Sequence, residues 1–181
     1  MTAARNVVIT GGGTGIGLAT TQLLAERGWQ VTAAGLERED SFPETASFIE
    51  CDVTDAASLS GVFGKFELLG GLVTSAHGAL QRGGGSVVNI ASMWSWFGNP
   101  VAPAYGTSKG AGAALTRSLA VSWGGSGVRV NAVAPGWVET RISEGARTDA
   151  ARRARIDARI PMGRWAATVE IAKVVAFLLS E

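Results

Sequence analysis

Short apolar runs alternate with longer amphipathic segments along most of the chain. Residues 6–10 (NVVIT) form a β-branched run that is followed at once by a glycine-rich loop. Residues 18–27 then carry apolar side chains at helical spacing, and residues 30–34 form a second apolar run. Such runs are typical of strands that are buried on both faces of a parallel sheet, with helices as crossovers. The pattern therefore predicts a β-α-β unit at the start of the chain.

The remaining chain repeats this alternation. Further strands are predicted just before Cys51 and at residues 72–76, 87–92 and 128–133, and helices at residues 56–66, 104–123 and 168–180. Residues 36–45 are polar and contain a proline, so they are predicted to form a loop. We expect an α/β fold with a Rossmann-like, doubly wound parallel sheet of about six strands in a three-layer α/β/α arrangement. One domain would span residues 1–181.

Composition narrows the class of protein. The chain of 181 residues is long enough for one substantial core, and its formal net charge of +1 gives no reason to expect nucleic acid or an anionic membrane as a partner. A single cysteine excludes an internal disulfide and fits a reducing compartment. The first ten residues lack the apolar run of a signal peptide, and no apolar stretch is long enough to span a membrane. A cytoplasmic location is therefore expected.

The glycine-rich loop is the first candidate functional element. Residues 11–17 read GGGTGIG and lie between a predicted strand and a predicted helix. Glycines permit a tight turn, and they let backbone N–H groups approach a pyrophosphate at the positive end of the helix dipole. A turn without a ligand is the alternative. The flanking strand and helix favour a loop that binds the phosphates of a dinucleotide.

A second group of candidates lies between residues 92 and 109. Ser92 ends a predicted strand, and Tyr105, the only tyrosine, precedes Lys109 by four residues. Tyr105 and Lys109 therefore share one face of a helix. The pKa of a free phenol is about 10, and a nearby ammonium lowers it by favouring the phenolate. With a serine hydroxyl to hold a substrate oxygen, this group can move a proton to or from an alcohol or carbonyl. Taken alone, the Tyr–Lys spacing also occurs in ordinary surface helices.

Together these motifs resemble those of the short-chain dehydrogenases/reductases. Residues 10–17 (TGGGTGIG) are similar to the family fingerprint T-G-x-x-x-G-x-G, and the serine, tyrosine and lysine keep the family spacing. Residues 51–55 (CDVTD) look like the acidic pair that follows the third strand of the family. Residues 128–136 (VRVNAVAPG) look like its sixth strand and the following P-G turn.

This resemblance implies an NAD(P)-dependent alcohol dehydrogenase or ketoreductase. It implies that Tyr105 is the acid/base, that Lys109 lowers the pKa of the tyrosine and binds the nicotinamide ribose, and that Ser92 orients the substrate oxygen. It gives Asp52 the role of holding the adenine amino group, and it implies no metal site. The implied cofactor contacts are Gly11, Thr14, Gly15, Ile16, Gly17, Asp52, Val53, Ala76, Tyr105, Lys109, Pro135, Gly136, Val138 and Thr140.

The choice between NAD and NADP is open in the sequence. The second strand is followed by neither of the usual signatures, because Gly35 replaces the acidic residue of NAD-preferring relatives and Leu36 the arginine of NADP-preferring ones. Glu37 would repel a 2′-phosphate, whereas Arg38 could pair with one. Thr14, in place of a basic loop residue, favours NAD slightly.

One segment departs from the family pattern. Seven residues separate Gly78 from Ser86, where relatives have a long helix that carries a catalytic asparagine. The chain could be a shortened member, the sequence could omit a segment of the real protein, or the next strand could pair differently. The relatives' final strand is also missing. A non-catalytic or impaired cofactor-binding relic, with a regulatory or scaffolding role, is therefore the alternative function. An acid/base enzyme without net redox, such as a cyclase or dehydratase, is a third.

Three features bear on partners and substrate. Trp94, Trp96 and Trp137 flank the predicted site, which favours a small apolar or aromatic substrate, although such residues also pack in cores and interfaces. Residues 110–114 (GAGAA) would give the long helix a small face suited to close packing in a homodimer or homotetramer. Seven arginines between residues 140 and 165 could favour an acidic substrate, but a solvated helix face with acidic partners explains them more simply.

Overall fold

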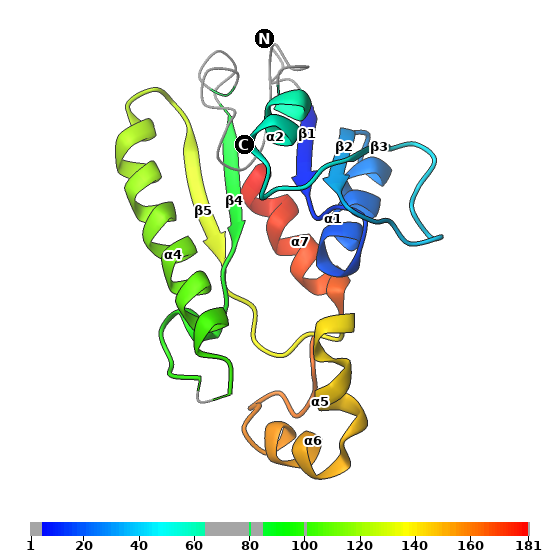
Figure 1. The fold of residues 1–181 in the computed structure, drawn as a ribbon, viewed down its shortest axis with the longest axis vertical. Coiled ribbons are helices and arrows are strands. Elements are labelled where there is room, and N and C mark those ends of the chain that lie inside the picture. Colours follow the sequence, from blue (N-terminus) through cyan, green and yellow to red (C-terminus); the bar gives the residue numbers. More distant parts are fainter. Residues whose placement is uncertain (1–4, 64–79, 81–84, 100, 181) are drawn as a thin grey trace.

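Parallel strands form the centre of the molecule, five of them in the part of the chain that the structure describes. The computed structural model describes residues 5–63, 80, 85–99 and 101–180 (Figure 1). The strands are β1 (Asn6–Thr10), β2 (Gln30–Gly35), β3 (Ser47–Glu50), β4 (Ser86–Ile90) and β5 (Arg129–Val133). Strands β1, β2 and β3 pair in that order, and β4 pairs with β5, always in parallel. The expected parallel α/β architecture is therefore confirmed.

Helices connect the strands and cover the sheet. They are α1 (Gly15–Glu26), α2 (Ala56–Phe63), α4 (Pro103–Gly124), α5 (Glu144–Thr148), α6 (Ala150–Asp157) and α7 (Thr168–Leu179), with short 3-10 turns η1 (Met93–Ser95) and η2 (Arg141–Ser143). Helix α1 begins three residues earlier than the apolar spacing predicts, because Thr14 is extended and acts as its N-cap. It ends before Gly28, whose φ of 77° is the left-handed conformation that glycine adopts readily. No described helix is long and apolar enough to cross a membrane.

Among the described residues, the structure shows five of the six expected strands. The expected strand at residues 72–76 lies outside the described residues, and so does Ala76. Within the described part of the chain, β1 and β4 share no ladder, so the strands form a three-stranded and a two-stranded sheet.

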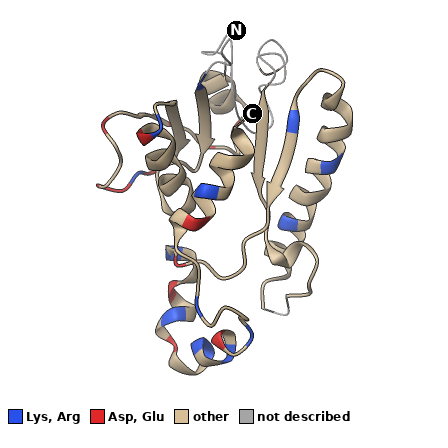
Figure 2. Ribbon diagram, turned by 180° about the vertical axis from the view of Figure 1, so that it is seen from behind, with Lys and Arg blue, Asp and Glu red and all other residues tan. Residues whose placement is uncertain are grey.

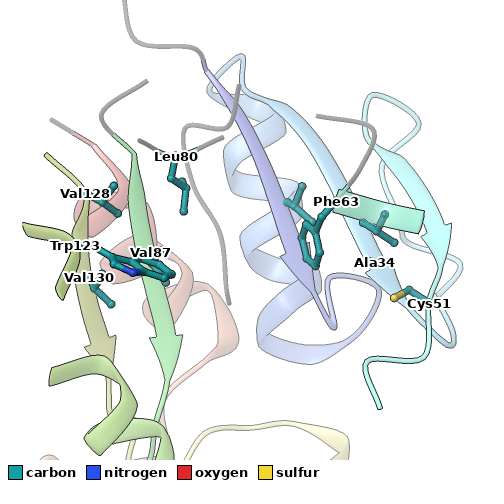
Figure 3. Packing of buried hydrophobic residues seen from close by; sticks show 10 residues of the cluster. Ala34, Cys51, Phe63, Leu80, Val87, Trp123, Val128 and Val130 are labelled. Carbon is teal, nitrogen blue, oxygen red and sulfur yellow. The ribbon is translucent and has the colours of Figure 1, made fainter. Parts of the chain in front are cut away.

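Alternating side chains bury both faces of the strands. Val8 and Val87 point into a cluster with α2 and α4, whereas their neighbours Val7 and Val88 point into a cluster with α1 and α7. Figure 3 shows the first cluster, in which Trp123 of α4 lies against Val87. Because successive strand residues face opposite sides, helix layers on both faces require the continuous apolar runs seen in the sequence. The three-layer α/β/α arrangement is therefore confirmed.

Residues 141–165 form a separate lobe with its own small core (Figure 1). The rings of Trp137 and Trp165 lie 4.9 Å apart, and Trp165 donates from Nε1 to Asp157 at 2.7 Å. Trp137 is partly buried and packs against this core, which contains Ala146 and Ile156. Core packing is the alternative to a substrate pocket that the sequence leaves open for this residue. Figure 2 shows charged residues gathered on this lobe, and the arginines there include an ion pair between Arg153 and Asp157.

A second ion pair joins this lobe to α7. Arg164 donates to both carboxylate oxygens of Glu170, at 2.7 and 2.8 Å, and the Ala167 N–H donates to the same group at 2.8 Å. The hydrogen bonds from Arg164, above all, lower the pKa of Glu170 from 4.5 to about 2. The carboxylate thereby closes the first turn of α7, where a negative charge is also favoured by the helix dipole.

Glu170→Gln is expected to flatten the acid dependence of stability. A carboxylate whose pKa is lower in the folded than in the unfolded protein stabilises the fold fully above the unfolded pKa of 4.5, and loses this contribution as the pH falls toward 2. The difference in unfolding free energy between wild type and variant should therefore shrink across that window in urea titrations. Arg164→Met should give a smaller flattening, because the Ala167 N–H still donates to Glu170, and the double variant should match Glu170→Gln. A difference that does not change with pH would contradict this assignment.

Candidate active site

The segment after β4 is fixed to α4 by a chain of hydrogen bonds. Ser92 is 5% exposed, and its Oγ accepts from the Trp94 N–H at 3.3 Å. The Ser92 N–H donates to Ser95 Oγ at 3.3 Å, and the Ser95 hydroxyl donates to the Lys109 carbonyl at 2.9 Å. The strand predicted to reach Ser92 ends at Ile90, because the residues beyond it turn into η1. Ser95 therefore links Ser92 to the helix that carries the lysine.

Tyr105 and Lys109 lie together on α4, as their spacing predicts. The Lys109 Nζ is 5.6 Å from the centroid of the Tyr105 ring, and it donates to the Ile90 carbonyl at 2.8 Å. Burial lowers the pKa of Lys109 from its ordinary value of 10.5. Tyr105 is 39% exposed, so its ring is accessible from solvent. The lysine thus ties the end of β4 to the tyrosine.

The glycine loop fits close contact with a ligand. Gly11 and Gly15 have φ values of 67° and 52°, which a side chain would strain. A Cβ on Gly13 would lie 2.1 Å from the Glu37 carbonyl oxygen, and one on Gly17 would lie 2.0 Å from the Gly11 carbonyl oxygen. Only glycines allow this packing, which presents backbone N–H groups at the start of α1. Such a cradle suits the phosphates of a dinucleotide.

The glycine loop and Lys109 line the same cavity. Its volume is about 500 Å³, and it lies between β1 and β4. Its lining includes Thr10, Gly11, Ile16, Gly17, Asn89, Ile90 and Lys109, together with residues of α4 and α7. Elements that are about 90 residues apart in the sequence therefore meet at one place. This is the arrangement that a cofactor held by the loop needs to reach the lysine.

The P-G turn after β5 approaches the same region. The Pro135 carbonyl accepts from the Met93 N–H at 3.2 Å, and a Cβ on Gly136 would lie 3.9 Å from the Met93 sulfur. Val138 is buried and forms an isolated bridge with Ala166.

The other predicted cofactor contacts are more dispersed. The Thr140 methyl group lies 3.8 Å from the position of a Cβ on Gly15, so this residue stands beside the glycine loop. Asp52 lies after β3, where its Oδ1 accepts from the backbone and the hydroxyl of Thr54 at 2.8 and 2.7 Å. The hydroxyl bond, then the backbone bond, lowers the pKa of Asp52. Val53 is exposed beside it. Ala76 lies outside the described residues.

Several residues of the site give little signal in the sequence. Ser95 could have been found from its place three residues after Ser92, a spacing that resembles a capping box. Asn89 lies within an apolar run, yet its side chain donates to Thr116 at 2.9 Å in the interior and joins β4 to α4. Glu37 forms an ion pair with Arg141, which is 104 residues away. Only the folded chain brings such pairs together.

Two family models match the chain. A model described as short chain dehydrogenase matches residues 5–76, and one described as enoyl-(acyl carrier protein) reductase matches residues 69–181. Cis-4-hydroxycyclohexanecarboxylate dehydrogenase of Sinomonas cyclohexanicum is 32% identical over 227 aligned positions, which cover 99% of this chain and 90% of that protein. Since this chain has 181 residues, the relative carries residues that have no counterpart here.

Solved structures of proteins described as dehydrogenases are also similar to this chain. A protein described as an NAD(P)-dependent gluconate 5-dehydrogenase from Beutenbergia cavernae, with NADP at low occupancy, has a TM-score of 0.87 and 31% identity. The match covers 98% of this chain and 90% of that one. A protein described as 2-deoxy-D-gluconate 3-dehydrogenase from Agrobacterium tumefaciens, with bound NADP, has a TM-score of 0.86 and 29% identity, covering 98% and 89%.

Proposed function

Because this chain belongs to the short-chain dehydrogenase/reductase family, we propose that it is an NAD(P)-dependent oxidoreductase that interconverts an alcohol and a ketone or aldehyde. One observation carries the proposal: the glycine loop and Lys109 line one cavity, and Lys109 stands against Tyr105. A phosphate-binding loop and a proton-transfer group on the same cavity suit hydride transfer that is coupled to proton transfer.

The cofactor supplies or accepts the hydride when it is bound, and the protein supplies position and protons. Tyr105 donates its phenolic proton to the carbonyl oxygen in reduction, and takes a proton from the alcohol in oxidation. The ammonium of Lys109 stabilises the negative charge that develops on the phenol oxygen. One of its three N–H groups is used by the Ile90 carbonyl, which leaves two to hold ribose hydroxyls.

Ser92 is suited to hold the substrate oxygen. Its Oγ accepts a hydrogen bond from the Trp94 N–H, and the hydroxyl proton, which takes no part in that bond, can be donated to a substrate oxygen. Ser95 acts as a positioning residue, because its hydroxyl connects the Ser92 backbone to the Lys109 carbonyl. The position of Ser92 relative to helix α4 is thereby fixed before a substrate binds.

The substrate and the cofactor form are also proposals. Trp96 and Phe97, both exposed just beyond Ser92, favour a small substrate with an apolar part. One relative is named for 4-hydroxycyclohexanecarboxylate, a molecule that combines an apolar ring with a carboxylate. The corresponding ketone is therefore a useful probe substrate. We retain a slight preference for NAD because Glu37 would repel a 2′-phosphate, but the two solved relatives contain NADP, so both cofactors need to be tested.

A coupled assay tests this function. We expect NADH or NADPH to be oxidised in the presence of at least one carbonyl from a panel that contains 4-oxocyclohexanecarboxylate, cyclohexanone and a ketogluconate. Cofactor binding without turnover on any of them would favour the non-catalytic cofactor-binding role. Loss of substrate with no change in nicotinamide absorbance would favour acid/base chemistry without net redox.

Assembly through α4 is a further part of the proposal. Val121 is 86% exposed on this helix, and Ala111 and Ala114 are exposed on its small face. A homodimer or homotetramer would cover these residues, and a cytoplasmic location would suit the free, buried Cys51.

A further inference from the structure

An acidic loop lies against the phosphate-binding end of α1. We use this name for residues 36–42 (LEREDSF), which follow β2. A hollow of about 420 Å³ separates part of this loop from the start of η2. Its lining includes Gly15, Gln22, Glu39, Ser41, Thr140, Arg141 and Arg147. The hollow therefore has the first residue of α1 on one side and two arginines on the other.

Hydrogen bonds hold the acidic loop against the glycine loop and helix α1. The Glu39 N–H donates to the Gly13 carbonyl at 3.0 Å, and Gln22 of α1 donates from Nε2 to the Ser41 carbonyl at 2.9 Å. The Gly15 N–H in turn donates to Oε1 of Glu39 at 3.2 Å. The carboxylate of Glu39 thus sits on the first N–H of the helix.

This N–H is one of the groups that a cofactor phosphate would use. The first four N–H groups of a helix have no partner within the helix, and they favour an anion. Thr14, the N-cap, makes no side-chain cap of its own. Glu39 therefore supplies an internal anion at the place where the glycine loop is built to receive an external one.

The charges around Glu39 also bear on the competition between its carboxylate and a bound phosphate. Arg141 pairs with Glu37, and the pKa of the arginine is raised first by the hydrogen bond to Glu37 and also, more weakly, by the charge of Glu39. One guanidinium thus faces two carboxylates, which lie on one short loop beside Gly15. An incoming phosphate therefore meets a hollow in which Arg141 already faces two acids, while Arg147 and Glu139 also line it.

We propose that Glu39 is an internal competitor of the cofactor, and that a dinucleotide binds by displacing its carboxylate from the Gly15 N–H. The inference rests on the proposed function, since it assumes that the glycine loop receives a dinucleotide. Displacement weakens binding by the free energy of the internal contact. The negative charge of the acidic loop opposes the binding of NADPH more than that of NADH, because NADPH carries an additional 2′-phosphate.

Titration of the purified protein with NADH and with NADPH, followed by quenching of tryptophan fluorescence, tests this role. Glu39→Gln keeps the shape and removes the charge. We expect its Kd to fall by about two- to fivefold for NADH and by more for NADPH, in line with the strength of an exposed anion at a helix N-terminus. Higher salt should shrink the gap between wild type and variant, because screening weakens the repulsion. Glu44→Gln, beyond the acidic loop, should leave both Kd values unchanged.

The possible outcomes distinguish a failure of this inference from a failure of the proposed cofactor binding. If wild type binds and Glu39→Gln binds equally or less tightly, the competitor role is overturned and the cofactor assignment stands. If only the variant binds, both are supported. If neither binds while both unfold cooperatively in urea, both are overturned. Glu39→Ala guards against a glutamine that keeps the Gly15 contact, and it should tighten binding at least as much.

Discussion

Tyr105→Phe is expected to lower the rate of nicotinamide-linked turnover by roughly 10²- to 10⁴-fold, the usual contribution of a positioned acid/base. The substitution removes only the hydroxyl that would carry the proton. The aromatic ring that faces the Lys109 ammonium at 5.6 Å remains, and so does the contact of this lysine with the Ile90 carbonyl. The chemical step should therefore fail while the site keeps its shape.

Cofactor affinity and a control variant make this prediction specific. The Kd for NADH and NADPH should change less than about threefold, because the lysine and the glycine loop are untouched. Ser108→Ala serves as the control, since it removes a hydroxyl from the same helix, one that donates to the Tyr105 carbonyl rather than to the cavity. Its turnover should stay near that of wild type. Full activity of Tyr105→Phe would exclude the tyrosine as acid/base.

Gly17→Ala is expected to have the second largest effect, this time on folding and cofactor binding together. An added methyl group would lie 2.0 Å from the Gly11 carbonyl oxygen, 2.7 Å from its carbon and 3.0 Å from the Gly12 Cα. These are backbone atoms and cannot rotate away, so the loop itself would have to move. We expect a loss of about 3 kcal/mol in unfolding free energy, at the upper part of the usual range for overpacking.

A urea titration and a cofactor titration measure the two effects on the same sample. Gly145→Ala is the matched control, because a Cβ there meets nothing within 4 Å in the described structure and alanine favours the helix. It should leave stability unchanged or slightly raised. If Gly17→Ala folds as stably as wild type and binds NADH or NADPH equally well, the close packing of the glycine loop is unimportant for either property.

Local pattern was sufficient for much of the fold. The apolar runs at β1, β2 and β5 predict the strands that are found, and the polar, proline-containing stretch after β2 is a loop as expected. The four-residue spacing of Tyr105 and Lys109 predicts their contact, because residues four apart on a helix face the same side. These features depend on backbone conformation and burial over a few residues, which neighbouring side chains largely specify.

Other predictions needed contacts that spacing does not supply. The expected strand at residues 72–76 lies outside the described residues, so it stays a prediction. Trp137 packs against Trp165, and its place after the P-G turn left both a substrate pocket and core packing open. An aromatic residue buries its surface wherever the folded chain offers a partner, and sequence position does not identify that partner.

The sequence by itself determined the family resemblance, the class of fold and the types of residue available for chemistry, since each of these is written in short motifs. Only the tertiary structure decided which of these motifs share a cavity, and that Glu39 already occupies the Gly15 N–H. The ion pair between Glu37 and Arg141 joins residues 104 positions apart. Such contacts form when packing closes long loops of chain, and that geometry is a property of the whole fold rather than of any one segment.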